Sequence, residues 1–396
     1  MQPVPFGAGA REFSIPRLAV LRLDPVLLLA TFGLVACSIY TIATATAGDI
    51  EGDPSYYWVR QSVYVAVGTV LMLAIASFDY SRLREWKLGI YATMIGLILL
   101  VYVVSGATRG SRRWIEFPFF NFQASELGKL LLIVSLAAFV VDRTRNFGDK
   151  ETTSRIMLLA VIPAIMVVAQ PDLGTGIVYG VVALALLFVA GTRWTHFAAL
   201  GTGVVLTAVI ALVAAPAVGV TVLKDYQVDR LTAFLNPSSD PQEQGYQVNQ
   251  SITAIGAGQK TGRGSDGATQ TKLDFLPEHH TDFVFAVVGE TFGFMGAALV
   301  LSLFALLIWR TLRIMTMAKN LYGTLIAGGI AGMLMFQLFV NVGMTLGIMP
   351  ITGVTLPLMS YGGSSVIVTF MALGVLQSIY IQGRDSAKRS IAGPSI

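Results

Sequence analysis

Ionisable side chains are rare in the apolar stretches of this chain, and two groups of them could carry chemistry. Gln123, Glu126 and Lys129 follow one another at three-residue intervals, which places them on one face of a helix. Asp282 opens a later apolar stretch, and Glu290 lies about two helical turns further on, within roughly a quarter turn of the same face. Charged groups inside a membrane are costly and are functional candidates, and an acid at each depth, Asp282 and Glu290, predicts a polar cleft that enters the membrane from outside.

Each group also has a structural interpretation. Glu126 and Lys129 can neutralise each other while the lysine snorkels outward, and spacing alone slightly favours this interpretation. Asp282, or Thr281 before it, can cap the following helix, although a cap and a catalytic carboxylate do not exclude each other. The adjacent histidines at 279 and 280 are weak evidence for a metal site, and hydrogen bonding at the membrane interface explains them better.

A short loop carries Arg109, Arg112 and Arg113, followed by Trp114. The loop is predicted on the outer side, where positive charge is normally scarce, so an anionic ligand is one interpretation. The other is a harmless loop whose orientation is decided by the remaining spans, and the two interpretations have equal weight.

Segment 347–365 is apolar yet rich in proline, glycine and hydroxyl residues, including Ser360 and Ser364. Such a backbone survives at membrane depth only where protein or a water-filled cavity satisfies its polar groups, which predicts a re-entrant segment. The amides of residues 362–365 can bind an anion at the start of the last helix, or the segment can pack closely with no ligand. Glycines in 256–264 superficially suggest a phosphate loop, but no strand precedes them, so nucleotide binding is discounted.

The elements that position these residues follow from the composition. Of 396 residues, 54% are hydrophobic and 13% are charged, against roughly 25% charged in soluble domains. This excludes a soluble enzyme and predicts an integral membrane protein. The single cysteine excludes an intramolecular disulfide and a cysteine-based metal site. Loop topology explains the net charge of +4 more simply than nucleic-acid binding does.

Ten apolar stretches, of which the fifth is short, predict an all-α polytopic bundle in one domain, 1–396. They cover residues 25–47, 57–77, 86–105, 124–141, 156–169, 173–190, 196–219, 282–309, 322–346 and 364–381. Residues 220–281 form the one large extracytoplasmic loop, with amphipathic turns lying against the membrane surface. Residues 1–23 and 382–396 are predicted tails. Most of the 27 Lys and Arg residues fall on the side of the two tails, which predicts that both termini are cytoplasmic.

Several separated segments resemble one family, the SEDS proteins RodA, FtsW and SpoVE, in the order in which that family has them. They are Arg113-Trp114, Gln123 to Lys129, Gln170 to Thr175, Asn236-Pro237, Gly245 to Gln247 with Gln250-Ser251, Leu276 to Phe283, and Asn341 to Ser365. Residues 267–270 are more similar to the elongation member, RodA, than to the division member. Two departures, Thr291 in place of a frequent acid and a glycine-poor 241–245, leave Asp282 untouched.

The resemblance implies a peptidoglycan glycosyltransferase in the bacterial cytoplasmic (inner) membrane, which polymerises lipid II on the outer side during cell elongation and shape maintenance. Asp282 is then the general base, with a pKa raised by partial desolvation, in an inverting transfer that releases undecaprenyl diphosphate. The expected partners are a class B penicillin-binding protein, a transpeptidase, and the cell-elongation machinery.

The resemblance also implies a set of substrate-binding residues and a cofactor. That set is Arg109, Arg112, Arg113, Trp114, Gln123, Glu126, Lys129, Glu278, His280, Ser360 and Ser364. A divalent cation, Mg²⁺ or Mn²⁺, is expected to bridge the phosphates and a carboxylate, with its protein ligands unassigned. Two alternatives stay open: a lipid II flippase, which should carry basic groups through the membrane, and a noncatalytic scaffold for a penicillin-binding protein, which would not need Asp282.

Overall fold

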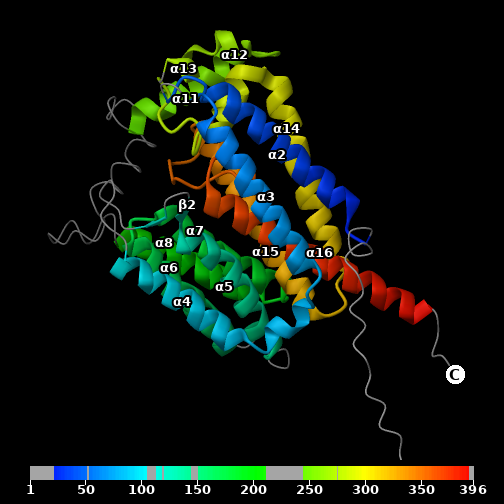
Figure 1. Cartoon of the computed structure of the whole chain (residues 1–396). Helices are drawn as coiled ribbons and strands as arrows, with labels where there is room; N and C mark the ends of the chain where they lie inside the picture. Colours follow the sequence, from blue (N-terminus) through cyan, green and yellow to red (C-terminus); the bar gives the residue numbers. More distant parts are fainter. Residues whose placement is uncertain are drawn as a thin grey trace, which may run out of the picture.

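The computed structural model is a bundle of long helices with a group of short helices at one end (Figure 1). The structure describes residues 22–50, 53–104, 113–117, 120–143, 150–210, 244–273 and 275–391. The long helices are α2 (Pro25–Ala45), α3 (Tyr56–Ala76), α4 (Lys87–Val104), α5 (Ala124–Val141), α6 (Lys150–Ala169), α7 (Leu173–Val189), α8 (Trp194–Val209), α14 (Val284–Met317), α15 (Leu321–Thr345) and α16 (Gly363–Ile391). Each predicted span overlaps one of them, which confirms the all-α membrane architecture; residues 211–219 of the seventh predicted span lie outside the described residues.

The helices differ in how far the protein itself encloses them. Within the described ranges, eight helices are long and apolar enough to cross a membrane; α7 is shorter, with 17 residues, as is the described part of α8, with 16. Helices α5, α15 and α16 are mostly buried, whereas only 17% of α4 is buried. Polar side chains on α5 or α16 are therefore shielded by neighbouring helices, and lipid contacts fall to the outer helices.

Three predicted helix ends are wrong, because polar residues extend the helices. The eighth span was expected to end at 309, but α14 continues through Arg310 and Arg313 to Met317. The fifth span was expected from 156, but α6 begins at Lys150, and an ion pair between Glu151 and Arg155 supports its polar first turns. The last span was expected to end at 381, but α16 continues to Ile391, and the Arg384 guanidinium donates to the Tyr380 hydroxyl at 3.2 Å one turn earlier.

The two described chain ends meet at one end of the bundle. Arg22 and Asp385 are 3.5 Å apart, and the main-chain N–H of Asp24 donates to Gln377 at 2.7 Å. The Asp24 carboxylate, fully buried, caps α2 and pairs with Arg310 of α14. The short helices lie at the other end of α2 and α14 (Figure 1).

Two non-helical features lie at the end of the bundle where the short helices gather. Residues 346–362 connect α15 to α16 without helix, and Leu356, Met359 and Ser360 within them are buried, as expected for a re-entrant segment enclosed by protein. The second feature, a hairpin of β1 (Ile115–Phe117) and β2 (Phe120–Phe122), was not predicted, because each strand has only three residues.

The described part of the large loop contains α11 (Gln244–Gly258), α12 (Gly264–Gly267) and α13 (Thr269–Lys272). These confirm the predicted helical turns, and α11 packs mainly on α14. Val248 and Ala254 are buried there, whereas Ile252 is exposed. The Lys272 ammonium, hydrogen-bonded to Asp266 at 2.9 Å, lowers the pKa of that exposed carboxyl below its ordinary value.

A break in α14 receives the chain that leaves α11. Gly293 has φ 64° and ψ −159° inside the helix, and the N–H groups of Phe294 and Met295 donate to the carbonyls of Gln259 and Lys260, at 2.9 and 3.2 Å. The Arg263 N–H donates to the Glu290 carbonyl at 2.9 Å. The loop thus supplies partners for backbone groups that the break releases.

Replacing Gly293 by alanine is expected to detach this loop. The new Cβ would lie 2.3 Å from the Gly262 nitrogen, and alanine disfavours the positive φ. We expect a loss of stability of about 1–3 kcal/mol and faster proteolysis within 244–273. Gly96→Ala, in α4 with open space around it, is the control and should be neutral or slightly stabilising. Equal protease resistance in both variants would contradict the prediction.

Candidate active site

Asp282 lies in the turn that leads into α14, at the end of the bundle away from the described chain ends. The turn is closed by the Phe283 N–H, which donates to the Glu278 carbonyl at 3.3 Å, and by the Thr281 hydroxyl, which donates to the Glu278 carboxylate at 3.0 Å. Phe283 is the N-cap of α14 and makes no side-chain capping bond. The alternative in which Asp282 or Thr281 caps the helix is therefore wrong, because the helix starts one residue later.

The re-entrant segment holds this turn from the other side. The buried Asn341 amide donates to the carbonyls of Asp282 and Val354, both at 2.9 Å, and so ties the turn to the segment. The Tyr361 N–H donates to the His280 carbonyl at 2.8 Å. At Gly353, a Cβ would lie 3.5 Å from the Asp282 Oδ2 atom. The half-buried Asp282 carboxylate therefore faces a backbone stretch without side-chain bulk.

Aromatic rings surround His280, and sequence analysis missed them. The His280 ring centroid lies 4.6 Å from that of Tyr57 and 5.7 Å from that of Tyr361. Tyr57 belongs to α3 and Tyr361 to the re-entrant segment, so three separate parts of the chain meet here. These rings form an aromatic wall at the turn that carries Asp282, two residues after His280.

Gln123 and Ser364, both predicted as site residues, are brought together in a second polar cluster. The Gln123 N–H donates to the Ser364 hydroxyl, and its side-chain amide donates to Asp172, both at 2.9 Å. Ser125 also donates to Asp172, at 3.1 Å. The sequence contained Asp172 in its Gln170-to-Thr175 stretch, but nothing local indicated its partners. Ser360, also predicted, accepts from the Leu356 N–H at 2.8 Å and thereby shapes the re-entrant segment.

Glu126 and Lys129 form a buried ion pair of 2.7 Å, with side chains 7% and 4% exposed. The interpretation in which Lys129 snorkels outward is therefore wrong, because its ammonium binds Glu126 on the same helix, where α4, α7 and α15 pack around α5. The neutralisation part of that interpretation is confirmed.

The remaining predicted residues divide into two groups. The Arg113 guanidinium donates to the carbonyls of Gln170, at 3.2 Å, and Pro171, and so fastens the α6–α7 turn; Trp114 beside it is half-buried. Arg109 and Arg112 lie outside the described residues.

Glu290 was expected to continue a polar cleft below Asp282, and that expectation is wrong. Its carboxylate is fully buried and accepts the N–H groups of Gln270 and Thr271, at 2.8 and 3.0 Å, and the Thr271 hydroxyl at 2.7 Å. The acid therefore anchors α13, because backbone N–H groups at a helix start attract a carboxylate.

The chain is similar in sequence to known proteins over most of its length. The chain matches the FtsW, RodA and SpoVE family, described as cell cycle proteins, over residues 21–385. Stage V sporulation protein E of Bacillus subtilis (strain 168) is 38% identical over 357 residues, which are 89% of this chain and 94% of that protein. Peptidoglycan glycosyltransferase MrdB of Escherichia coli (strain K12) is 36% identical over 367 residues, covering 93% of this chain and 96% of that protein.

Solved structures also match. One, described as the structural coordination of polymerization and crosslinking by a peptidoglycan synthase complex, has a TM-score of 0.77 and 30% identity, covering 93% of this chain and 99% of that chain. Rod shape determining protein RodA of Thermus thermophilus has a TM-score of 0.67 and 28% identity, covering 92% of this chain and 97% of that chain.

Proposed function

Because this chain belongs to the FtsW, RodA and SpoVE family, we infer that it is a peptidoglycan glycosyltransferase of the membrane and propose that it polymerises lipid II with Asp282 as its general base. The observation that carries the assignment of Asp282 is its placement. Its half-buried carboxylate lies between the turn before α14 and the glycine-containing backbone of the re-entrant segment, beside an aromatic wall.

The proposed reaction is a single displacement. The Asp282 carboxylate takes the proton of the acceptor sugar 4-hydroxyl, and the oxygen attacks the anomeric carbon of the donor from the face opposite the leaving group. The bond from that carbon to the diphosphate oxygen breaks, and its electron pair leaves with undecaprenyl diphosphate. The anomeric configuration inverts because one displacement occurs.

Cationic groups must offset the charge that develops on the diphosphate. Of the proposed groups, Lys129 already pairs with Glu126, and Arg113 already binds two carbonyls. Arg109 and Arg112, which precede Arg113 in the sequence, are therefore our preferred diphosphate ligands. Lys129 would contribute when the substrate competes with Glu126 for its ammonium.

A divalent cation of the Mg²⁺ or Mn²⁺ class remains part of this proposal. Among the described residues, no group of three metal-ligating side chains includes Asp282. Such an ion takes most of its ligands from phosphates and water, with one or two carboxylates, and this requirement fits the site. Exposed Glu278 would be the protein ligand, since Asp282 must receive the proton; the ion would supply charge neutralisation.

The partner and the cellular location are also proposals. The match to a synthase complex that coordinates polymerization and crosslinking supports a class B penicillin-binding protein as partner. The distribution of Lys and Arg supports the bacterial cytoplasmic membrane with both termini inside and Asp282 outside. Residues 267–270 support the elongation role.

One reconstitution tests the function against its alternatives. The full chain, purified with its penicillin-binding partner, is placed in liposomes with fluorescent lipid II. We expect fluorescent glycan polymer, detected as bands on a gel, and we expect no polymer in liposomes that lack this chain. Translocation of lipid II without polymer would favour the flippase, and polymerisation by the partner alone would favour the scaffold.

A further inference from the structure

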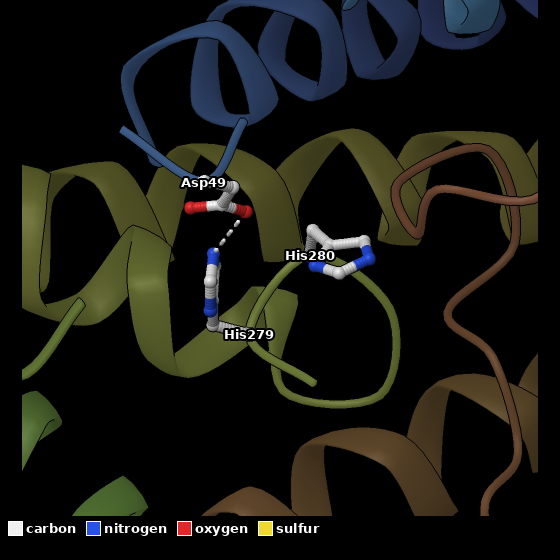
Figure 2. A group of neighbouring side chains, drawn as sticks. All are labelled: Asp49, His279 and His280. Carbon is white, nitrogen blue, oxygen red and sulfur yellow. Dashed lines mark ion pairs between the residues drawn. The ribbon is translucent and has the colours of Figure 1, made fainter. Parts of the chain in front are cut away.

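Asp49, His279 and His280 form a compact cluster, of which Asp49 and His279 have no part in the proposed reaction (Figure 2). Asp49 lies in the turn after α2, and the two histidines lie in the turn before α14. One ligand atom of each residue lies within 4.8 Å of the others, and His279 is buried. The cluster thus joins two outer turns that are far apart in the sequence.

The hydrogen bond at Nδ1 of His279 determines whether its other ring nitrogen, Nε2, is protonated in the neutral ring. Its Nδ1 atom lies 3.2 Å from the Leu276 carbonyl, and a carbonyl only accepts, so Nδ1 carries a hydrogen. In the neutral ring, Nε2 then presents its lone pair to the Asp49 carboxylate, 3.2 Å away (Figure 2). The two side chains are only 6% and 15% exposed, and a cation between them would satisfy both the lone pair and the carboxylate.

The spacing fits a metal ion as that cation. Zinc binds imidazole nitrogen at about 2.0–2.1 Å and carboxylate oxygen at about 2.0–2.2 Å, so two tetrahedral ligand atoms lie about 3.3–3.5 Å apart. The observed separation of 3.2 Å between Nε2 and Oδ2 is close to this. A metal-bound histidine usually donates a hydrogen bond from its other ring nitrogen, and a backbone carbonyl is a common acceptor.

We propose that Asp49, His279 and His280 bind one zinc-class transition-metal ion, which clips the turn after α2 to the turn that carries Asp282. Two imidazoles and one carboxylate favour Zn²⁺ over Mg²⁺, which prefers oxygen ligands, so this site is separate from the ion proposed for the diphosphate. Since Asp282 follows His280 by two residues, the ion fixes the backbone next to the catalytic carboxylate. The proposal does not depend on the role of Asp282.

The experiment is a Zn²⁺ titration of the full chain in detergent, in competition with a chromophoric chelator. A Cys37→Ser background removes the single thiol. We expect one equivalent bound, a higher melting temperature with Zn²⁺, and a tetrahedral visible spectrum with Co²⁺. Asp49→Asn and His279→Gln should each lower the affinity at least about tenfold and remove the thermal shift.

His196 provides the matched control, because it is the third of only three histidines and lies elsewhere, bonded to Thr153 at 2.8 Å. His196→Gln should bind Zn²⁺ like the parent. The proposal is overturned if the parent binds no Zn²⁺, or if Asp49→Asn and His279→Gln bind it as well as the parent does. The cation between His279 and Asp49 would then be a proton on His279.

Discussion

Replacing Asp282 by asparagine is expected to abolish polymer formation and to leave the fold intact. Asparagine has the same size, and the main-chain carbonyl that accepts from Asn341 remains. Its amide cannot take the proton of the acceptor hydroxyl, and a positioned general base typically accelerates a reaction by about 10²–10⁴-fold. Single-turnover polymerisation of lipid II, measured with the purified chain and its partner, should therefore fall by about that factor.

Asp53→Asn is the control for this prediction. Asp53 is an exposed acid in the turn before α3, so its loss changes the net charge by the same amount and should leave the rate unchanged. The parent rate should also fall as the pH is lowered, because protonated Asp282 cannot accept a proton. If Asp282→Asn keeps a tenth or more of the parent rate, Asp282 is not the general base.

The sequence alone was sufficient to predict where the helices lie and that Asp282 stands at the start of one of them, for a physical reason. A bilayer requires long apolar helices, so α2 and α15 are visible as uninterrupted apolar runs, and an acid such as Asp282 beside such a run is conspicuous. Glu290 was equally conspicuous, yet its carboxylate binds α13. Periodicity shows on which face of a helix a charge lies but not which distant segment covers that face.

Partners far apart in the sequence explain the other differences. The glycines near 262 were weighed only as a phosphate loop, whereas Gly262 and Gly293 permit two backbones to touch. Arg113 was interpreted as an anion ligand, but its donors serve the carbonyls of Gln170 and Pro171, which lie on another turn. The role of Asp172 as a hydrogen-bond acceptor for Gln123 became visible only in the folded structure, which places the two side chains together.

Removing Lys129 from its buried ion pair with Glu126 is expected to destabilise the protein strongly. Removing one member of a buried ion pair leaves an uncompensated charge, which costs about 3–5 kcal/mol. Lys129→Ala should therefore lower the free energy of unfolding by that amount, because the Glu126 side chain is only 7% exposed and water cannot replace the lost ammonium. The matched double variant, Glu126→Gln with Lys129→Met, removes both charges at similar volume and should recover most of the stability. Thermal unfolding in detergent measures both.

Polymerisation by that double variant then separates a structural role from a substrate-binding role. If Lys129 contributes to stabilising the diphosphate, the double variant is folded but slow, because methionine cannot offset the developing charge. We expect this result, with binding of the partner unchanged. Full recovery of both stability and rate would show that the pair only holds α5 among its neighbours, and Arg109 and Arg112 would then remain as the proposed ligands of the diphosphate.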